Sequence, residues 1–257
     1  MTASEPPGTV IPPAAAAAEP VPARSAQRRV ALVGLFVLLL VSLAGRTGFA
    51  FWEPPFDGTI RYDDVRALGD AYWPMNLYLG GPGYAVSWVA CAGFIVLLAR
   101  GRAGVLNLVG ALLAGIGGIL FALTITAEAL PFAYAADPAV LPEAEGRQLF
   151  DVLNAHLDRL LPSIIGAQVA IALGVLFALI GTLISKTMPR RLSITGIAYV
   201  VVFVGLPTES LGAVVVAAGY LLQVALIAAI GWFGLVHAGS LPRPSDPIEE
   251  RRVTRDP

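Results

Sequence analysis

The sequence predicts an all-α integral membrane protein: a bundle of about six transmembrane helices with two acidic extracytoplasmic loops, one containing an amphipathic helix. The first observation is composition, because 56% of the 257 residues are hydrophobic and only 14% are charged, against about 45–50% and about 25% in soluble domains. The second is a series of apolar stretches that meet or approach the roughly 20 residues needed to cross a hydrocarbon core about 30 Å thick. Backbone groups in lipid must be paired within the protein, so these stretches form helices.

The same composition excludes several classes of protein. A formal net charge of -1 gives no basic footprint for nucleic acid. Cys91 is the only cysteine, which excludes an intrachain disulfide and a cysteine-based metal site. No phosphate-loop, zinc-protease or serine-hydrolase motif is present, so no catalytic, cofactor-binding or metal-binding residue is predicted. Lys186 is the only lysine, and this preference for arginine is typical of GC-rich bacterial genomes.

The chain divides into three parts. Residues 1–29 are rich in proline and alanine and predict a disordered cytoplasmic tail. Residues 30–237 form the transmembrane domain, and residues 238–257 form a charged cytoplasmic tail. The long leader and the lack of a small-residue cleavage site favour a retained first span over a signal peptide.

Six apolar spans are expected in the transmembrane domain. They cover about residues 30–50, 82–99, 104–130, 162–185, 192–207 and 211–236. The fifth is the weakest, because it is short and closes at Pro207, and a re-entrant hairpin is the alternative there.

The distribution of Lys and Arg predicts the orientation. With both termini in the cytoplasm, all but five of the 17 Lys and Arg residues lie on the cytoplasmic side. The five on the other side are Arg46, Arg61, Arg66, Arg147 and Arg159. The expected location is the cell membrane, with the lipid bilayer as the surroundings.

Two acidic loops, residues 53–80 and 131–160, face the outside in this orientation. The second loop predicts a helix from about Pro142 to Leu161, whose apolar stripe lets it lie on the membrane or cap the bundle. The stripe consists of Phe150, Leu153, Leu157, Leu160 and Leu161.

The first acidic loop leads into the second span. Tyr72, Trp73, Tyr78 and Trp88 are expected in an interfacial aromatic belt. The glycine-rich segment at residues 80–83 predicts a flexible entry to the span.

Ionisable residues are almost absent from the middle of the expected spans, which disfavours a proton-driven transporter and a bis-His haem site. Arg46 and Glu128 lie near the outer edge. An ion pair between them would guard an outward-facing cavity. The alternative, which we favour at this point, is that each side chain snorkels to the interface.

Polar residues within the spans offer hydrogen bonds between helices. Gln223 lies near the middle of the last span, one turn after Tyr220, while Gln168 and Asn107 lie in other spans. Interhelical hydrogen bonding is the favoured interpretation for these residues, and contact with a substrate is the alternative.

Small residues recur at four-residue spacing in two spans, which predicts close helix packing or, alternatively, self-association. One stripe is Gly110, Ala114 and Gly118, and the other is Gly166, Ala170, Gly174, Ala178 and Thr182. A metal site in the outer helix is disfavoured, because Asp151, His156 and Asp158 do not share the three- or four-residue spacing of one helix face.

The leading functional interpretation is a non-catalytic envelope protein that acts through a membrane-protein partner or through self-association. A facilitator of a neutral or lipid-like solute, lined by Gln168, Tyr220 and Gln223, is the second. A membrane-embedded enzyme with acids at the outer face, such as Asp63, Asp64 or Glu128, is the third.

Overall fold

The computed structural model describes residues 21–54, 56, 58–205 and 212–240. All regular structure in these ranges is helical, as the sequence predicts. Five helical segments are long and apolar enough to cross a membrane, and they are Ala26–Trp52, Tyr62–Leu97, Gly101–Ala136, Leu161–Ser185 and Val214–Gly239.

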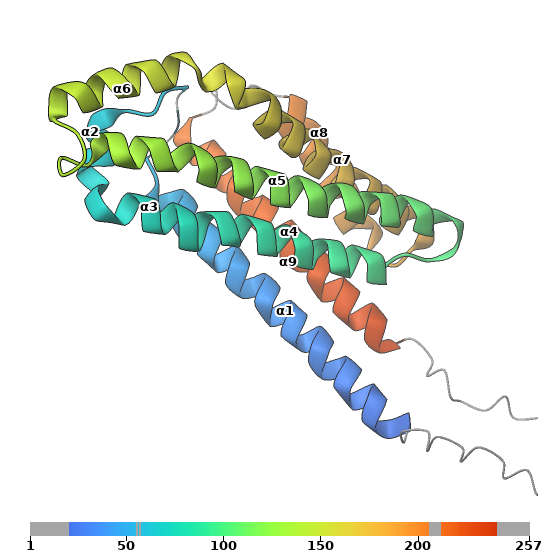
Figure 1. Ribbon diagram of the computed structural model, residues 1–257. Helices are drawn as coiled ribbons and strands as arrows, with labels where there is room; N and C mark the ends of the chain where they lie inside the picture. Colours follow the sequence, from blue (N-terminus) through green and yellow to red (C-terminus); the bar gives the residue numbers. More distant parts are fainter. Residues whose placement is uncertain (1–20, 55, 57, 206–211, 241–257) are drawn as a thin grey trace, which may run out of the picture.

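The long helices run side by side and form a bundle (Figure 1). Three short helices, α2, α3 and α6, gather at one end, which we term the capped end. The described chain begins and ends toward the opposite end (Figure 1). The helices are α1 (Val21–Trp52), α2 (Tyr62–Leu68), α3 (Tyr72–Met75), α4 (Gly81–Leu97), α5 (Gly104–Ala136), α6 (Glu143–Ala155), α7 (Leu161–Ser185), α8 (Arg190–Gly205) and α9 (Ala213–Ser240).

The two expected tails lie partly outside the described residues. Helix α1 begins at Val21, before the apolar run that starts at Val30. The rest of the predicted N-terminal tail, residues 1–20, and most of the C-terminal tail, residues 241–257, lie outside the described residues.

The first predicted loop is largely helical, which corrects the expected start of the second span. From Tyr62 the chain passes through α2, a 3₁₀ turn, α3 and a π-helical turn directly into α4. Pro82 lies in the first turn of α4, directly after the π-helical turn. The glycine-rich segment is therefore a helical packing surface and not a flexible entry.

Close approach between helices explains that glycine-rich segment. A Cβ on Gly83 would lie 2.9 Å from the backbone nitrogen of Arg46, and a Cβ on Gly80 would lie 2.8 Å from the ring of Phe49. Only glycine lets α4 begin this close to α1.

Helix α8 coincides with the weak fifth span. It has 16 residues and is not among the five long apolar segments. Both α7 and α9 run away from the capped end (Figure 1). Helix α8, which lies between them in the chain, runs back toward the capped end and packs beside α7.

Small residues bring α5 and α7 together, which agrees with the close helix packing that their spacing predicts. A Cβ on Gly110 would lie 2.5 Å from the carbonyl oxygen of Gly174, and a Cβ on Gly174 would lie 2.6 Å from the nitrogen of Ala114. The stripes are not uniform, because a Cβ on Gly118 would meet Trp88, while a Cβ on Gly166 would meet nothing within 4 Å among the described residues.

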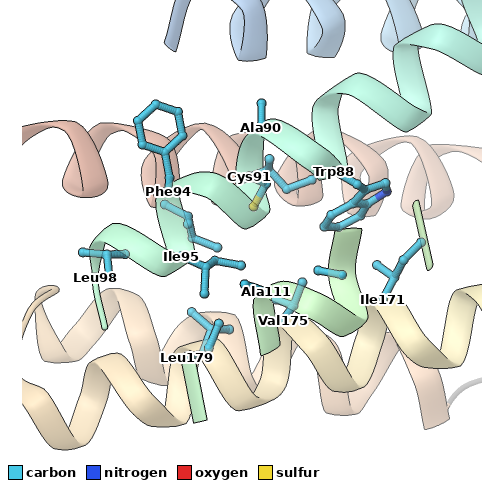
Figure 2. Packing of buried hydrophobic residues seen from close by; sticks show 14 of the residues in the cluster. Trp88, Ala90, Cys91, Phe94, Ile95, Leu98, Ala111, Ile171, Val175 and Leu179 are labelled. Atoms are coloured by element: carbon cyan, nitrogen blue, oxygen red, sulfur yellow. The ribbon is translucent and has the colours of Figure 1, made fainter. Parts of the chain in front are cut away.

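The main core lies among α1, α4, α5, α7, α8 and α9. Figure 2 shows Cys91 and Ile95 of α4 turned toward Ala111 of α5 and Val175 of α7. These four side chains are at most 8% exposed.

A second core forms the capped end and decides the place of α6. Phe150 of α6 meets Phe132 of α5 and Tyr62 of α2 at ring-centroid distances of 4.9 and 5.2 Å. The amphipathic helix therefore caps the bundle with its apolar side. It also ends at Ala155, earlier than the predicted Leu161, and a 3₁₀ turn follows.

Candidate functional site

Arg46 of α1 is the most unusual residue of the bundle, because its side chain is charged and 0% exposed within a candidate membrane span. Its Nε donates a hydrogen bond to the Tyr220 hydroxyl (3.1 Å) and its Nη1 donates one to Ser87 Oγ (3.2 Å). Its Nη2 donates a third hydrogen bond to Oε1 of Gln223. One guanidinium therefore connects α1, α4 and α9.

Three aromatic rings surround the same guanidinium. The Arg46 Cζ lies 4.8 Å from the ring centroid of Tyr84 and 5.4 Å from those of Trp88 and Tyr220. Rings at such distances attract a cation through their quadrupole. Trp88, expected in an interfacial belt, is 3% exposed and belongs to this cage, so that expectation is wrong.

The partners of Arg46 are all neutral. In the described part of the chain, the carboxylates that form ion pairs are Asp63 and Glu143, both with Arg147 at the capped end. Ionisable residues within membrane helices are rare, usually face the interior of the bundle and mark ligand or ion pathways. The three hydrogen bonds use one N–H on each nitrogen, so two of the five guanidinium N–H groups remain for other acceptors.

A cavity of about 560 Å³ adjoins this cage. Its polar lining lies toward the capped end and its apolar lining extends toward the opposite end. The polar residues are Arg46, Tyr84, Gln168, Tyr199, Tyr220 and Gln223. The others are Trp88, Phe121, Ile165, Val169, Ile171, Ala172, Val175, Leu179, Val200, Val216, Leu226, Ile227 and Ile230.

The structure brings together four of the five residues singled out from the sequence. Arg46, Tyr220 and Gln223 are joined by hydrogen bonds, and Gln168 lines the same cavity. Arg46 neither snorkels to a surface nor pairs with Glu128, because its side chain is fully buried among neutral partners.

Glu128 lies elsewhere, where its charge acts on Glu53, a residue that does not stand out in the sequence. The charge of Glu128 and, above all, burial raise the pKa of Glu53 to about 7. Glu53 directly follows the last residue of α1 and was placed in a loop by its sequence context. Two carboxyl groups thus share the capped end of the bundle.

Three residues of α4 that contact Arg46 do not stand out as a group in the sequence, although their spacing indicates a common helix face. Tyr84, Ser87 and Trp88 stand three and four residues apart and therefore share one face of α4. That face meets Arg46 of α1.

Asn107 does not form the expected interhelical hydrogen bond. Its amide is 0% exposed, and neither of its polar atoms has a hydrogen-bond partner among the described residues. The amide oxygen lies against Gly181, where only a glycine leaves room for it. Steric fit between α5 and α7 places this residue.

No group of three or more His, Cys, Asp or Glu side chains in the described residues could hold a metal ion. The chain was also compared with known proteins. No protein-family model, curated protein or solved structure matches it.

Proposed function

We propose that this chain is a multi-pass membrane protein that binds an anionic ligand between its helices, with Arg46 as the group that holds the anion. The five long apolar segments support a membrane location. The observation that carries the proposal is a fully buried guanidinium with neutral partners only, in the wall of a cavity of about 560 Å³. Pockets that enclose small-molecule ligands have volumes of about 300–1,000 Å³.

The ligand anion replaces a neutral acceptor at the guanidinium. Tyr220 and Gln223 are partly exposed, line the cavity and carry two of the three hydrogen bonds of Arg46. Hydrogen bonds between a cation and an anion are roughly twice as strong as neutral ones. A carboxylate or phosphate that takes the place of the Gln223 amide therefore gains energy, and the planar guanidinium fork suits either group.

This proposal is the facilitator interpretation with its chemistry revised. A neutral solute would leave the Arg46 charge without a counterion, whereas an anion compensates it. Binding to a partner through residues 142–161 has less support, because the apolar side of α6 is already packed on α2 and α5.

The proposal includes six membrane crossings, with α8 as the fifth. Since α7 and α9 run in the same direction and α8 returns between them (Figure 1), six crossings put both termini on one side. The positive-inside rule makes that side the cytoplasm and makes the capped end extracytoplasmic. The membrane is then the cell membrane.

Thermal unfolding in nanodiscs of neutral phosphatidylcholine tests the anion site. Decanoate and decyl phosphate should raise the midpoint of the wild-type protein, while decanol, with the same chain and no charge, should not. Arg46→Gln should remove the response, and Arg102→Gln, an exposed arginine at the opposite end, should keep it.

Equal shifts with decanol and decanoate would overturn the proposal, as would an unchanged response of Arg46→Gln. If Arg46→Gln does not fold, Gln223→Leu replaces it. That variant keeps the guanidinium and should bind decanoate at least as tightly as the wild type, because the anion no longer competes with the amide oxygen. Loss of decanoate binding in Gln223→Leu would contradict the proposal.

A further inference from the structure

We infer that the ligand is a single-chain amphiphile, an acyl chain with an anionic head, that enters the cavity sideways from the bilayer between α7 and α9. This inference rests on the proposed function for the anionic head and adds the chain and its route. Three features of the cavity carry it.

The first feature is the separation of polar and apolar lining along the bundle. Arg46, Gln168 and Gln223 lie toward the capped end, whereas Val175, Leu179 and Ile230 lie toward the opposite end. A head held at Arg46 therefore directs its chain along an apolar wall. From Gln168 to Leu179 helix α7 rises about 16 Å, close to half of a hydrocarbon core about 30 Å thick. The wall thus has the length of a chain that spans one leaflet.

The second feature is the rim of the cavity. Ile165 and Val169 of α7 and Val216 of α9 line the cavity and are also 53%, 44% and 40% exposed. These residues lie within the candidate membrane spans, so the exposed rim faces lipid tails. An acyl chain that passes this rim moves from the lipid tails to the apolar wall of the cavity without crossing water.

The third feature is the packing of α7 and α9, the two helices that form the walls of the entrance. Helix α9 packs against α1 and α4, whereas α7 packs against α5 and α8. The hydroxyl of Tyr199 on α8 donates a hydrogen bond to the carbonyl oxygen of Gly219 on α9 (3.0 Å). The two walls are thus joined through α4 and α5, which pack on each other, and through this hydrogen bond, so a wider gap between α7 and α9 at the rim leaves the α1–α4, α4–α5 and α5–α7 contacts in place.

A route from water past the capped end has less support. In the described residues, none of the cavity lining comes from α2, α3 or α6. The volume of about 560 Å³ suits one chain, which is why we infer a single-chain amphiphile and not a two-chain lipid.

Photocrosslinking of the full chain in phosphatidylcholine nanodiscs tests the inference. The probe is hexadecanoic acid with a diazirine in the middle of its chain, and crosslinked residues are identified by mass spectrometry. Crosslinks should concentrate on the apolar wall, at residues such as Val175 and Ile227. Hexadecanoate should compete with the probe, and hexadecanol should not.

Substitutions at the rim test the route. Val216→Trp should lower crosslinking at the apolar wall about tenfold by narrowing the entrance, whereas Leu112→Trp on α5, 64% exposed, should leave it unchanged. Crosslinks confined to lipid-facing residues such as Leu112 would overturn the inference, and so would an unaffected Val216→Trp. Stronger competition by a two-chain phosphatidic acid than by hexadecanoate would overturn the single-chain assignment.

The two proposals fail in distinguishable ways. If decanoate stabilises the protein through Arg46 but the probe does not reach Val175, the anion site stands and the chain and route are wrong. If neither decanoate nor decyl phosphate stabilises the protein, the anion site itself is wrong.

Discussion

The Nε of Arg46 donates a hydrogen bond to the Tyr220 hydroxyl at 3.1 Å and so joins two helices through residues that lie 174 positions apart in the chain. The same guanidinium reaches Ser87 on α4. A single buried cation thus connects α1, α4 and α9 through neutral hydrogen-bond partners. Under the proposed function, helix packing and ligand binding therefore depend on the same residue.

Tyr220→Phe should destabilise the bundle moderately. The substitution removes the acceptor of the Nε hydrogen bond but keeps the ring that lies beside the cation, and a loss of roughly 1–2 kcal/mol is expected. Thermal unfolding in detergent measures it. Tyr78→Phe, at a tyrosine 74% exposed, is the matched control and should not shift the midpoint.

Gly83→Ala should lower the stability of the protein, whereas Gly48→Ala should not. The added methyl group of Gly83→Ala meets the backbone of Arg46 at 2.9 Å and forces α1 and α4 apart, at a cost of about 1–3 kcal/mol. At Gly48 nothing lies within 4 Å of the added group, so better helix propensity should leave stability unchanged or slightly raised. Similar midpoints for the two variants would contradict the close contact of α1 and α4.

Two substitutions in the small-residue stripe of α7 should also differ in their effect on stability. Gly174→Ala places a methyl group 2.6 Å from the nitrogen of Ala114 and should destabilise the α5–α7 contact by about 1–3 kcal/mol. Gly166→Ala belongs to the same stripe but meets nothing within 4 Å and should be tolerated. Equal loss in both variants, measured by thermal unfolding, would favour a role of the whole stripe in self-association.

Glu53 should make stability depend on pH. Burial and the charge of Glu128 raise its pKa from 4.5 to about 7, so the folded protein binds the proton more tightly than the unfolded chain. Stability should therefore fall as pH rises from about 4.5 to about 7. Glu53→Gln should flatten this part of the profile, whereas Glu145→Gln, at an exposed carboxyl on α6, should not. A profile of Glu53→Gln identical to that of the wild type would contradict the burial of Glu53.

Much of the fold follows from the sequence because apolar length and small-residue spacing are local properties. They predict the long helices, the faces on which α5 and α7 pack closely, and the amphipathic α6. The helical segments between Tyr62 and Gly80 do not follow from the sequence, because acidic and glycine residues usually mark loops. Here Gly80 and Gly83 allow α4 to approach α1 closely, and that depends on which helix lies opposite.

The candidate site was predictable only in part. Arg46, Gln168, Tyr220 and Gln223 stand out because polar residues are rare in apolar spans. Their assembly was not predictable, since periodicity identifies the faces of a helix but not its neighbours. Position along α1 suggested that Arg46 reaches an interface, whereas Tyr220 and Gln223 of α9 enclose it.

The most direct test of the anion site is the dissociation constant of decanoate for the wild-type protein, Arg46→Gln and Arg102→Gln, measured by titration calorimetry in phosphatidylcholine nanodiscs. The arrangement of Arg46 predicts binding that weakens about tenfold or more in Arg46→Gln, a change of at least about 1.4 kcal/mol, and stays unchanged in Arg102→Gln. Equal dissociation constants for all three proteins would contradict the assignment of Arg46 as the anion-binding group.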